Sequence, residues 1–565
     1  MASTRDLRLL HRLGPTPTPV SGETFAPRTR ADFPPGYPSS GSGQPYDAGS
    51  SGRRMTSFNP SRLGPSSSLY GSHDLMLARC HDEVRNNPWA ASAVDNFESQ
   101  IVGNGIKPKW NLKNDKLKEQ IEREFHLWAA SRFSDQAGLL NYYGLQALAA
   151  REIFEGGEVF VRRHIRAPKW RPRPGTRPLR VPLQIQLIES EQVPIWLNIS
   201  ATTPGPIGTP AGNVVRTGKE YDKDQRLVAF HMFAEHPGET MFFPSTAIRF
   251  VRVGSEDVLH AYKPFRAGLL RGQPHLASTL VLLHELTKYT DATVVAKQIQ
   301  AMFAGFIKKV TPESDLLPPD PSFPAGVVSP YAPQGTRVAN IEPGSLTELF
   351  PGEDITFPNL PQNSDMAAFM GIMLHQFAVA IGATYEQVTG DLRGVNLSSI
   401  RSGVQDAHRK CEQFIYNVAV TQFCEPIVHW WLDEAVLSGR LRLPGYAQEP
   451  EQYQDITWNT SGWPWLDPSK DIEAKKAAVR AGFTTRETVC AETGEDASKI
   501  DVQRKLECER EDRLEVVYDT RPDKILVGRE ANPTVPEEGA SEAEETEPED
   551  PNADKLDKSG IMRIG

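Results

Sequence analysis

Apolar residues recur at spacings of three and four over long stretches of the chain, which predicts amphipathic helices. One predicted helix begins near Ser72 and ends at Asn86-Asn87, where Pro88 suits the first turn of the next helix. That second helix runs to Gly103, and further helical spacing covers residues 115–132 and 140–155. The first ordered part of the chain is therefore expected to be a group of packed helices.

Alternation of apolar and polar residues then predicts strands at 158–165, 183–188 and 247–251. Taken with the preceding helices, these strands indicate one mixed α/β unit over residues 70–270. The predicted fold class is accordingly α+β, with helix predominant.

The longest helical pattern starts at Pro274 and continues for about 30 residues. Residues 310–361 are rich in proline and glycine and partly strand-like, and helical spacing resumes over 367–381. A second long helix is expected over 398–437, kinked or divided at Pro426. Helix, insertion and helix together predict a two-helix stalk that carries a small module.

Shorter helices are predicted in the C-terminal third. Asp467-Pro-Ser-Lys is a plausible helix start, Thr484 and Glu487 have capping-box spacing, and Asp496 is expected to cap a last helix that ends near Glu511. Residues 1–68, rich in Pro, Gly, Ser and Arg, cannot repay chain entropy by burial, so we expect a flexible arm that contacts nucleic acid or an acidic partner, or is simply solvated.

The overall balance of charge in the chain gives no indication of tight DNA binding. The 565-residue chain has a formal net charge of −10, but nine acidic residues and no basic ones lie between Glu537 and Asp554. The rest of the sequence is close to neutral, without the basic excess expected of a protein that wraps DNA. If DNA is handled, we expect it to be guided rather than tightly bound.

Cysteine usage and hydropathy indicate the compartment. The five cysteines form no CxxC pair, which argues against a disulfide framework or a zinc ribbon and favours synthesis in a reducing cytosol. No apolar run has the length of a membrane span, and the first residues lack a signal-peptide core. We therefore expect a protein made in the cytoplasm and not embedded in a membrane.

The sequence offers little catalytic chemistry. Gly218-Lys219 is followed by Glu220 and does not complete a P-loop, and the His284-Glu285 pair lacks a second zinc ligand because position 288 is lysine. His408 and Cys411 lie three residues apart on a predicted helix, where packing is the favoured explanation. No catalytic, cofactor or metal residue is predicted, although a scattered carboxylate set, as in a metal-dependent nuclease, stays an alternative.

Four segments carry a family resemblance. They are Asp82–Asp95 (DEVRNNPWAASAVD) with Ile101–Pro108 (IVGNGIKP); Arg271–Ala277 (RGQPHLA); Pro351–Gly382 with Tyr385–Arg401 (YEQVTGDLRGVNLSSIR); and Trp463–Pro468 with Gly482–Arg486 and Glu492–Asp496. In this order they resemble the lambda-type family of tailed-phage portal proteins over residues 72–510. Leu397 stands where the family typically has an aromatic residue.

The resemblance implies a portal-type fold with a wing, a two-helix stem, a small α/β clip and a helical crown. The implied divisions are a flexible arm (1–68), wing (69–273), stem helix (274–308), clip (309–361), stem helix (362–382), tunnel loop and long wing helix (383–460), crown (461–511) and an acidic, disordered tail (512–565).

It also implies candidate channel residues. The family's tunnel loop corresponds to residues 385–399, with Tyr385, Asp391, Arg393, Asn396, Ser398 and Ser399 as candidates, and Lys288 and Lys297 are candidates on the channel face of the stem. An equally plausible interpretation is that Asp391 and Arg393 only cap helices.

The function implied by the resemblance is a dodecameric ring at one capsid vertex, a passive channel for packaging and ejection of double-stranded DNA. Without a P-loop, the energy must come from a docked terminase large subunit; head–tail adaptors and the major capsid and scaffold proteins would be further partners, with no cofactor and no membrane. Two alternatives remain: a monomeric scaffold or adaptor, distinguished by its oligomeric state, and a metal-dependent nuclease, distinguished by DNA cleavage.

Overall fold

The computed structural model describes residues 57, 60–202, 208–239, 250–302, 306–309, 353–356, 366–393, 396–462, 468–516 and 518. The chain divides into two units, Met1–Ser68 and Leu69–Gly565, and the described elements lie almost entirely in the second. Most of the expected arm and of the acidic tail, the clip apart from Lys309 and residues 353–356, and the Trp463–Asp467 motif lie outside the described residues.

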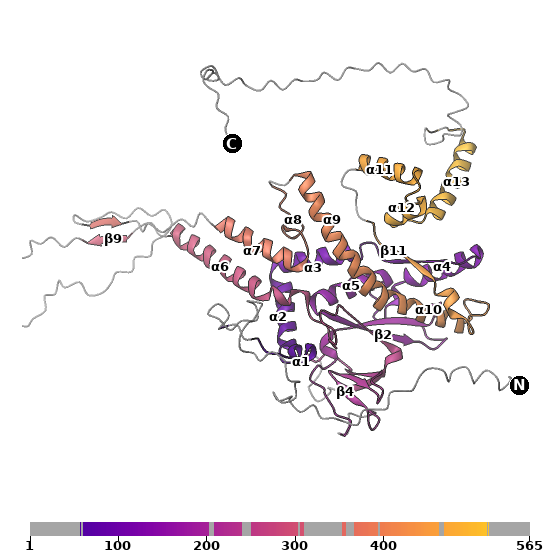
Figure 1. Cartoon of the computed structure of the whole chain (residues 1–565), viewed down its shortest axis with the longest axis horizontal. Coiled ribbons are helices and arrows are strands. Elements are labelled where there is room, and N and C mark those ends of the chain that lie inside the picture. The colour runs from indigo at the N-terminus through magenta and orange to yellow at the C-terminus, as the bar shows by residue number, and fades with distance from the viewer. Residues whose placement is uncertain are drawn as a thin grey trace, which may run out of the picture. The chain divides into compact units, whose positions relative to one another are not determined.

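Helices predominate in the described part of the second unit (Figure 1). The α-helices are α1 (Pro65–Tyr70), α2 (His73–Asn86), α3 (Pro88–Ile101), α4 (Asp115–Ala129), α5 (Tyr142–Glu155), α6 (Leu280–Met302), α7 (Met366–Ile381), α8 (Tyr385–Thr389), α9 (Leu397–Phe414), α10 (Glu425–Leu437), α11 (Pro468–Arg480), α12 (Arg486–Glu492) and α13 (Ala497–Leu514). The predicted helices from 72 to 155 are confirmed, including the break at Asn87-Pro88.

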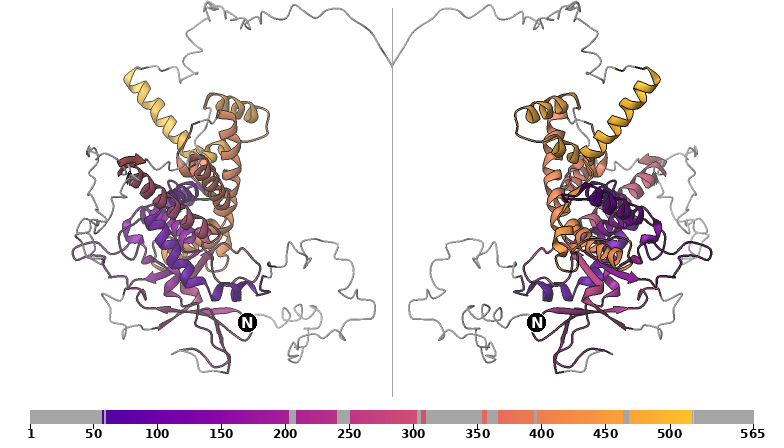
Figure 2. Two further views of the ribbon diagram at one scale, coloured as in Figure 1. Left: turned by 90° about the vertical axis from the view of Figure 1, so that its left-hand side faces the viewer. Right: turned by 90° about the vertical axis from the view of Figure 1, so that its right-hand side faces the viewer.

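The strands form small antiparallel sheets (Figure 2). They are β1 (Lys107–Trp110), β2 (Glu158–Ile165), β3 (Leu183–Ile188), β4 (Val214–Arg216), β5 (Lys219–Tyr221), β6 (Leu227–Phe233), β7 (Phe250–Gly254), β8 (Val258–Tyr262), β9 (Phe306–Lys309), β10 (Glu353–Thr356) and β11 (Ile456–Asn459). Their orders are β3-β2-β8, β4-β5-β6-β7, β1-β11 and β9-β10. An α+β class with predominant helix is thus confirmed; 247–249 of the predicted third strand lie outside the described residues.

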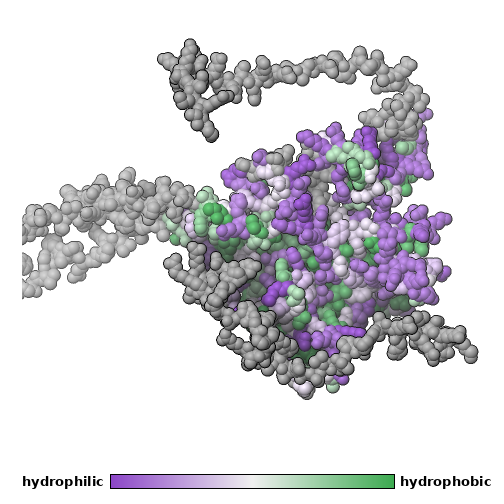
Figure 3. Space-filling view, viewed as in Figure 1, coloured by the Kyte–Doolittle hydropathy of each residue, from purple (hydrophilic) through white to green (hydrophobic). Residues whose placement is uncertain are grey.

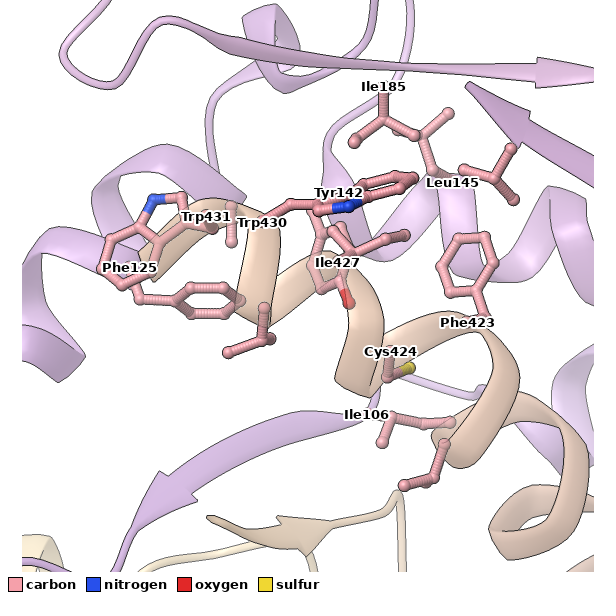
Figure 4. Close-up of a cluster of buried hydrophobic side chains, with 14 of the residues drawn as sticks. Ile106, Phe125, Tyr142, Leu145, Ile185, Phe423, Cys424, Ile427, Trp430 and Trp431 are labelled. Atoms are coloured by element: carbon pink, nitrogen blue, oxygen red, sulfur yellow. The ribbon is translucent and has the colours of Figure 1, made fainter. Parts of the chain in front are cut away.

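The main core lies between α4, α5, the sheet that contains β2, and the helical segment Ile415–Leu437, which ends with α10 (Figure 4). Trp431 is fully buried, edge-on to Phe125 with ring centroids 5.1 Å apart. The buried Trp110 on β1 donates its indole N–H to the Tyr453 carbonyl at 3.0 Å, which ties β1 to the segment before β11. Aromatic burial of this kind is a large favourable term, about 1.5–3 kcal/mol per side chain.

Helix α6 begins later than the sequence predicts. The chain after Pro274 first forms the 3₁₀ turn η9 (His275–Ser278), and the α-helix starts at Leu280. The Thr279 hydroxyl donates to the Leu276 carbonyl at 2.9 Å, and this local bond closes the tighter turn. A helix starting at Pro274 is therefore corrected to one starting at Leu280.

The second long helix is not continuous. Helix α9 passes into a π-helix, η10 (Ile415–Cys424), and α10 follows with Pro426 in its first turn. Proline has no N–H to donate and crowds the preceding turn, so the ordinary α register cannot pass through this point. The predicted division is confirmed, but it takes the form of a wider helix before Pro426 rather than a kink at it.

The C-terminal helices agree with their predicted positions. Asp496 caps α13, accepting the backbone N–H of Ser498 at 3.0 Å. The cap of α12 is Thr485, whose hydroxyl accepts from Thr488 N, so the capping box expected from Thr484 and Glu487 is wrong by one residue. Glu487 instead forms an ion pair with Lys109 on β1.

Candidate functional site

Helices α6 and α7 form an antiparallel pair whose far ends are joined by β9 and β10. Glu353 is paired with Lys309, and Thr356 with Phe306, in an antiparallel ladder. Along the helices, Tyr289 of α6 packs against Phe369 of α7 with ring centroids 4.8 Å apart. The expected order of helix, insertion and helix is present, and the two-stranded ladder sets where the insertion begins and ends.

The helix pair carries apolar side chains on surfaces that the chain itself leaves uncovered (Figure 3, green over α7). Leu283 and Leu286 are buried, whereas the large apolar side chains that are exposed among the described residues of the pair are those of Val281, Val294, Val295, Phe369, Ile372 and Val379. A helix that is apolar on more than one face is normally covered on more than one face. The pair therefore has the surface of an element that packs against other polypeptide.

The two candidate lysines of α6 are solvent-facing. Lys288 is exposed and pairs with Glu285 at 3.1 Å, one turn earlier on the helix. Lys297 is exposed as well. Neighbouring His284 and Glu285 therefore belong to a solvated helix face, in agreement with the interpretation favoured from the sequence.

The segment from Tyr385 is partly helical rather than a loop. Thr384 and Gln387 form a capping box that starts α8, and Gly390 ends it in the left-handed conformation, with φ 68°. Tyr385 stacks on His375 of α7, with ring centroids 4.2 Å apart and 10° between the planes. Tyr385 is thus held against the helix pair.

Asp391 and Arg393 bond to one another. The Arg393 guanidinium donates to both Asp391 oxygens at 2.9 Å, and this pairing lowers the pKa of Asp391 to about 2. Gly390 closes α8 and Asn396 caps α9, so the interpretation that the pair caps helices is wrong. Arg393 stands 92% exposed, which leaves a cation presented to solvent.

Asn396 and Ser399 define the start of α9. The Asn396 carboxamide oxygen accepts the Ser399 N–H at 2.9 Å, and the Ser399 hydroxyl bonds back to Asn396. Ser398 lies in the helix, and its side chain is outside the described residues. The six tunnel-loop candidates therefore lie between the start of α8 and the first turn of α9.

Helix α3 holds this segment in place, which sequence reasoning missed. The Ser92 hydroxyl donates to the Val388 carbonyl at 3.0 Å, and the Asn96 amide donates to the Gln387 carbonyl at 2.6 Å. The two donors lie one turn apart on the same face of α3. Their spacing of four residues was the available signal, but Asp95, Glu98, Ser99 and Gln100 are also polar, so the signal was weak.

The Arg271–Ala277 segment anchors the chain just before η9 and α6. Arg271 is 1% exposed and donates to Glu158 as well as to the carbonyls of Val193, Thr217 and Ser190. Burial disfavours a charged Glu158, but Arg271 and His260 outweigh it and hold the pKa of Glu158 well below its usual value.

Gly272 is required by close packing at the same place. Its N–H donates to Glu158 at 2.6 Å, and an added Cβ would lie 2.2 Å from the Gly157 carbonyl oxygen. The charged network and the glycine contact together fix the chain just before η9.

A cysteine lies close to a histidine in the sequence at Cys80–His81 and at His408–Cys411, and neither place is a nucleophilic site. Burial raises the pKa of the Cys80 thiol to about 12, and the neighbouring His81 pairs with Glu155 at 2.6 Å. The Cys411 thiol donates to Gln100 at 3.2 Å, and burial raises its pKa to about 11. These thiols stay protonated at neutral pH, and the five cysteines, all among the described residues, form no disulfide.

One group among the described residues has ligand atoms close enough for a metal ion: Glu189, Glu191 and His236. Nε2 of His236 lies 3.1 Å from Glu189 and 2.7 Å from Glu191. Nδ1 of the same ring accepts the Gly238 N–H at 3.0 Å, so both ring nitrogens of His236 have a hydrogen-bond partner.

In the part of the chain that the structure describes, no helix combines the length and apolar character of a membrane span.

Sequence comparison places these features in a wider context. The family model described as "Phage portal protein, lambda family" matches residues 51–414, more than half of the chain. The "Probable portal protein" of Halomonas phage phiHAP-1 is 26% identical over 463 residues, which cover 79% of this chain and 83% of that protein. The "Portal protein" of Escherichia phage N15 is 21% identical, covering 80% and 88%, and "Portal protein B" of Escherichia phage lambda is 20% identical, covering 81% and 88%.

Comparison with solved structures finds chains of gene transfer agent (GTA) particles. A chain of the "Neck of native GTA particle computed with C12 symmetry" has a TM-score of 0.39 at 14% identity, covering 78% of this chain and 97% of that chain. A chain of the "Neck of empty GTA particle computed with C6 symmetry" has a TM-score of 0.41 at 14% identity, covering 77% and 98%.

Proposed function

Because the chain belongs to the lambda family of phage portal proteins, we propose that it forms a dodecameric ring at one capsid vertex through which double-stranded DNA passes. The observation that carries the ring is the exposed apolar surface of α6 and α7. In a closed ring of heterologous contacts, each stem helix pair has a neighbour on either side, and its apolar residues are covered. This makes the protein a structural component of the virion rather than an enzyme.

The division into portal parts is also proposed. The wing would comprise 69–273, the stem 274–308 and 362–382, the clip 309–361, the tunnel loop and long wing helix 383–460, and the crown 461–511. The described stem pair, α6 and α7 with the β9–β10 ladder beyond it, supports this assignment. It leaves the clip at the end of the stem away from the helical body.

The proposed channel surface consists of exposed polar residues on the stem and the tunnel loop. Lys288 and Lys297 of α6 and Arg393 of the tunnel loop are exposed cations, and Lys288 and Arg393 each have an acidic partner. Paired charges and a near-neutral body give DNA no deep electrostatic well, because tightly neutralised phosphates would resist sliding. We expect a passive conduit driven by a docked terminase large subunit.

The remaining partners follow from the same proposal. Head–tail adaptor proteins would replace the terminase after packaging, and the major capsid and scaffold proteins would surround the ring at the vertex. Assembly would take place in the host cytoplasm before the ring enters the virion.

Electron microscopy of the purified protein with native mass determination tests the ring. Rings with a central hole and a mass near twelve times 62.7 kDa are expected. A stable monomer at every protein and salt concentration contradicts the ring and favours an adaptor. Metal-dependent cleavage of DNA by the purified chain would favour the alternative that the protein is a nuclease.

The tunnel-loop assignment has its own test in DNA packaging. Arg393→Ala frees Asp391, so unpaired negative charges face the DNA and we expect less packaged DNA per particle, with ring formation unchanged. Packaged DNA is measured by nuclease protection in an in vitro packaging reaction. Arg132→Ala, a loss of the same charge beside α4, is the matched control, and an equal effect of both variants contradicts the assignment.

A further inference from the structure

The loop that joins β2 to β3 is strongly basic. The two strands pair antiparallel, and beyond them the Arg166 N–H donates to the Pro182 carbonyl at 2.8 Å, which closes the loop 166–182. Eight lysines and arginines and no acidic residue lie between Glu158 and Glu189. The near-neutral total charge of the chain conceals this local excess of positive charge.

Local contacts hold this loop in shape. The Thr176 N–H donates to the Arg173 carbonyl at 3.1 Å, and Gly175 between them adopts the left-handed conformation, with φ 81°. The Arg166 guanidinium lies over the ring of Trp170, 4.8 Å from its centroid. The turn and the aromatic contact therefore give the loop a defined backbone from which its other cations extend.

Most cations of the loop have no acidic partner. Arg180 pairs with Glu124 at 2.7 Å, and Arg440 lies 3.7 Å from the same carboxylate, so two arginines share one negative charge. The Arg171 guanidinium donates to a backbone carbonyl, that of Thr176, at 3.0 Å. In the part of the chain that the structure describes, no carboxylate forms an ion pair with the four exposed cations Lys169, Arg171, Arg173 and Arg177. Their charge is therefore open to an external anion.

We infer that this loop binds the phosphate backbone of double-stranded DNA, without preference for base sequence. A guanidinium forks onto phosphate oxygens, and each phosphate that it neutralises releases condensed counterions from the duplex. Contacts to phosphates position a protein on DNA but carry no sequence information. The loop belongs to neither the stem nor the tunnel loop, so the inference adds a DNA contact to those proposed for the channel.

The choice of DNA as the polyanion rests on the proposed function, which brings a duplex to this protein. The sequence offers one competitor, the acidic segment Glu537–Asp554 of this chain, with nine carboxylates. An extended peptide of that composition has one charge per about 7 Å, whereas a DNA duplex has one per about 1.7 Å. Several cations on one short loop gain more from the denser polyanion, which favours DNA.

Fluorescence anisotropy of a labelled DNA duplex of about 20 base pairs on the full-length protein, repeated over a series of NaCl concentrations, tests the inference. The loop variant replaces four residues with glutamine: Lys169, Arg171, Arg173 and Arg177. We expect it to bind about tenfold more weakly than the parent at low salt. Its plot of log affinity against log salt concentration is expected to be shallower by about 2–4, because each lost phosphate contact removes about 0.9 from the slope.

A matched control separates this loop from general attraction between DNA and positive charge. It replaces one lysine and three arginines, exposed on α11 and α13, with glutamine: Lys476, Arg480, Arg510 and Arg513. We expect this control to keep the parent's affinity within about twofold and the parent's salt slope. Thermal unfolding of both variants checks that their folds match the parent.

A second loop variant keeps the charge and removes the guanidinium fork. It carries Arg171→Lys, Arg173→Lys and Arg177→Lys together. We expect the parent's salt slope, because the number of neutralised phosphates is unchanged, with an affinity lower by about twofold to fivefold. A slope as shallow as that of the glutamine variant would contradict phosphate neutralisation by the loop.

Equal DNA affinity of the parent and the glutamine loop variant overturns the inference, as does equal weakening by the control. If a synthetic peptide of residues 537–554 binds the parent but not the loop variant, while duplex DNA does not bind, the acidic segment is the occupant and DNA is excluded. Native mass determination on the same samples reports ring formation separately. Rings without loop-dependent DNA binding overturn this inference alone, whereas a failure of the proposed function appears as the absence of rings.

Discussion

At the scale of single residues, the packing around Glu158 depends on buried charged groups. The Glu158 carboxylate accepts hydrogen bonds from Arg271, His260, Ser190 and the backbone N–H of Gly272. Each of these partners lies at least 32 residues away in the sequence. The Arg271–Ala277 motif is visible in the sequence, but its electrostatic partner is not, because Glu158 lies more than one hundred residues earlier. The role of Arg271 is therefore learned from packing and not from its motif.

Removing the Glu158 charge is expected to destabilise the fold strongly. Glu158→Gln leaves the guanidinium of Arg271 buried without its counter-charge, which costs about 3–5 kcal/mol. A lowered midpoint of thermal unfolding measures the effect. The exposed Glu119→Gln is the control, expected within about 0.5 kcal/mol of the parent protein. Equal midpoints for the two variants would show that the network contributes little.

His275 makes stability depend on pH. It lies stacked on Phe154 at 5.2 Å, and burial lowers its pKa to about 4. Between pH 6.5 and 4 the unfolded chain binds a proton that the folded chain does not, so stability falls as the pH drops through this window. His275→Phe is expected to reduce that loss by up to about 3 kcal/mol, measured by denaturation at pH 7.5 and 4.5.

At the scale of helices and strands, the sequence predicts a boundary well where neighbouring residues determine it. Asn87-Pro88 sets the corner between α2 and α3, because the Asn87 side chain accepts from Trp89 and Ala90 N–H groups and proline suits the first turn. The π-helix η10 was not predictable, since its register depends on distant contacts. Within it, the Gln422 amide oxygen accepts the Tyr262 N–H at 3.0 Å, and Cys424 lies against Gln146.

The Asn87 cap gives an element-scale prediction. Its amide also donates to Thr287 of α6 at 3.2 Å, so one side chain caps α3 and ties it to the stem. Asn87→Ala is expected to cost about 2 kcal/mol, against about 1 kcal/mol for Asn114→Ala, the exposed cap of α4. Thermal unfolding measures both. A smaller loss at Asn87 than at Asn114 would contradict the tie to the stem.

At the scale of the whole molecule, the stem's apolar surface was only partly visible in the sequence. Helical periodicity located both helices, but which of their apolar residues stay exposed depends on what the rest of the chain covers. Phe377 and Leu283 are buried at the base of the stem, while Ile372 and Val281 are exposed. That difference, rather than the apolar content, is the basis for the proposed contact with other subunits. It could not be read from the spacing alone.

Charging this surface is expected to prevent ring assembly. Ile372→Glu introduces a carboxylate into the proposed subunit contact, where its desolvation is costly. We expect monomers or small oligomers by native mass determination, with circular dichroism unchanged. Leu127→Glu makes the same change at an exposed apolar position of α4 and should keep the ring. Intact rings of Ile372→Glu would show that α7 lies outside the contact.

The pairing of Lys309 with Glu353 also bears on how such a protein diversifies. Two chain ends held in one antiparallel ladder are about 5 Å apart whatever sequence connects them. Lengthening a closed segment costs little, about 0.6 kcal/mol for each doubling. We therefore expect that residues 310–352 can be replaced by a segment of different length and sequence without loss of the α6–α7 pair. Chimaeras joined at these two strands should keep the parent's fold, as measured by circular dichroism and thermal unfolding.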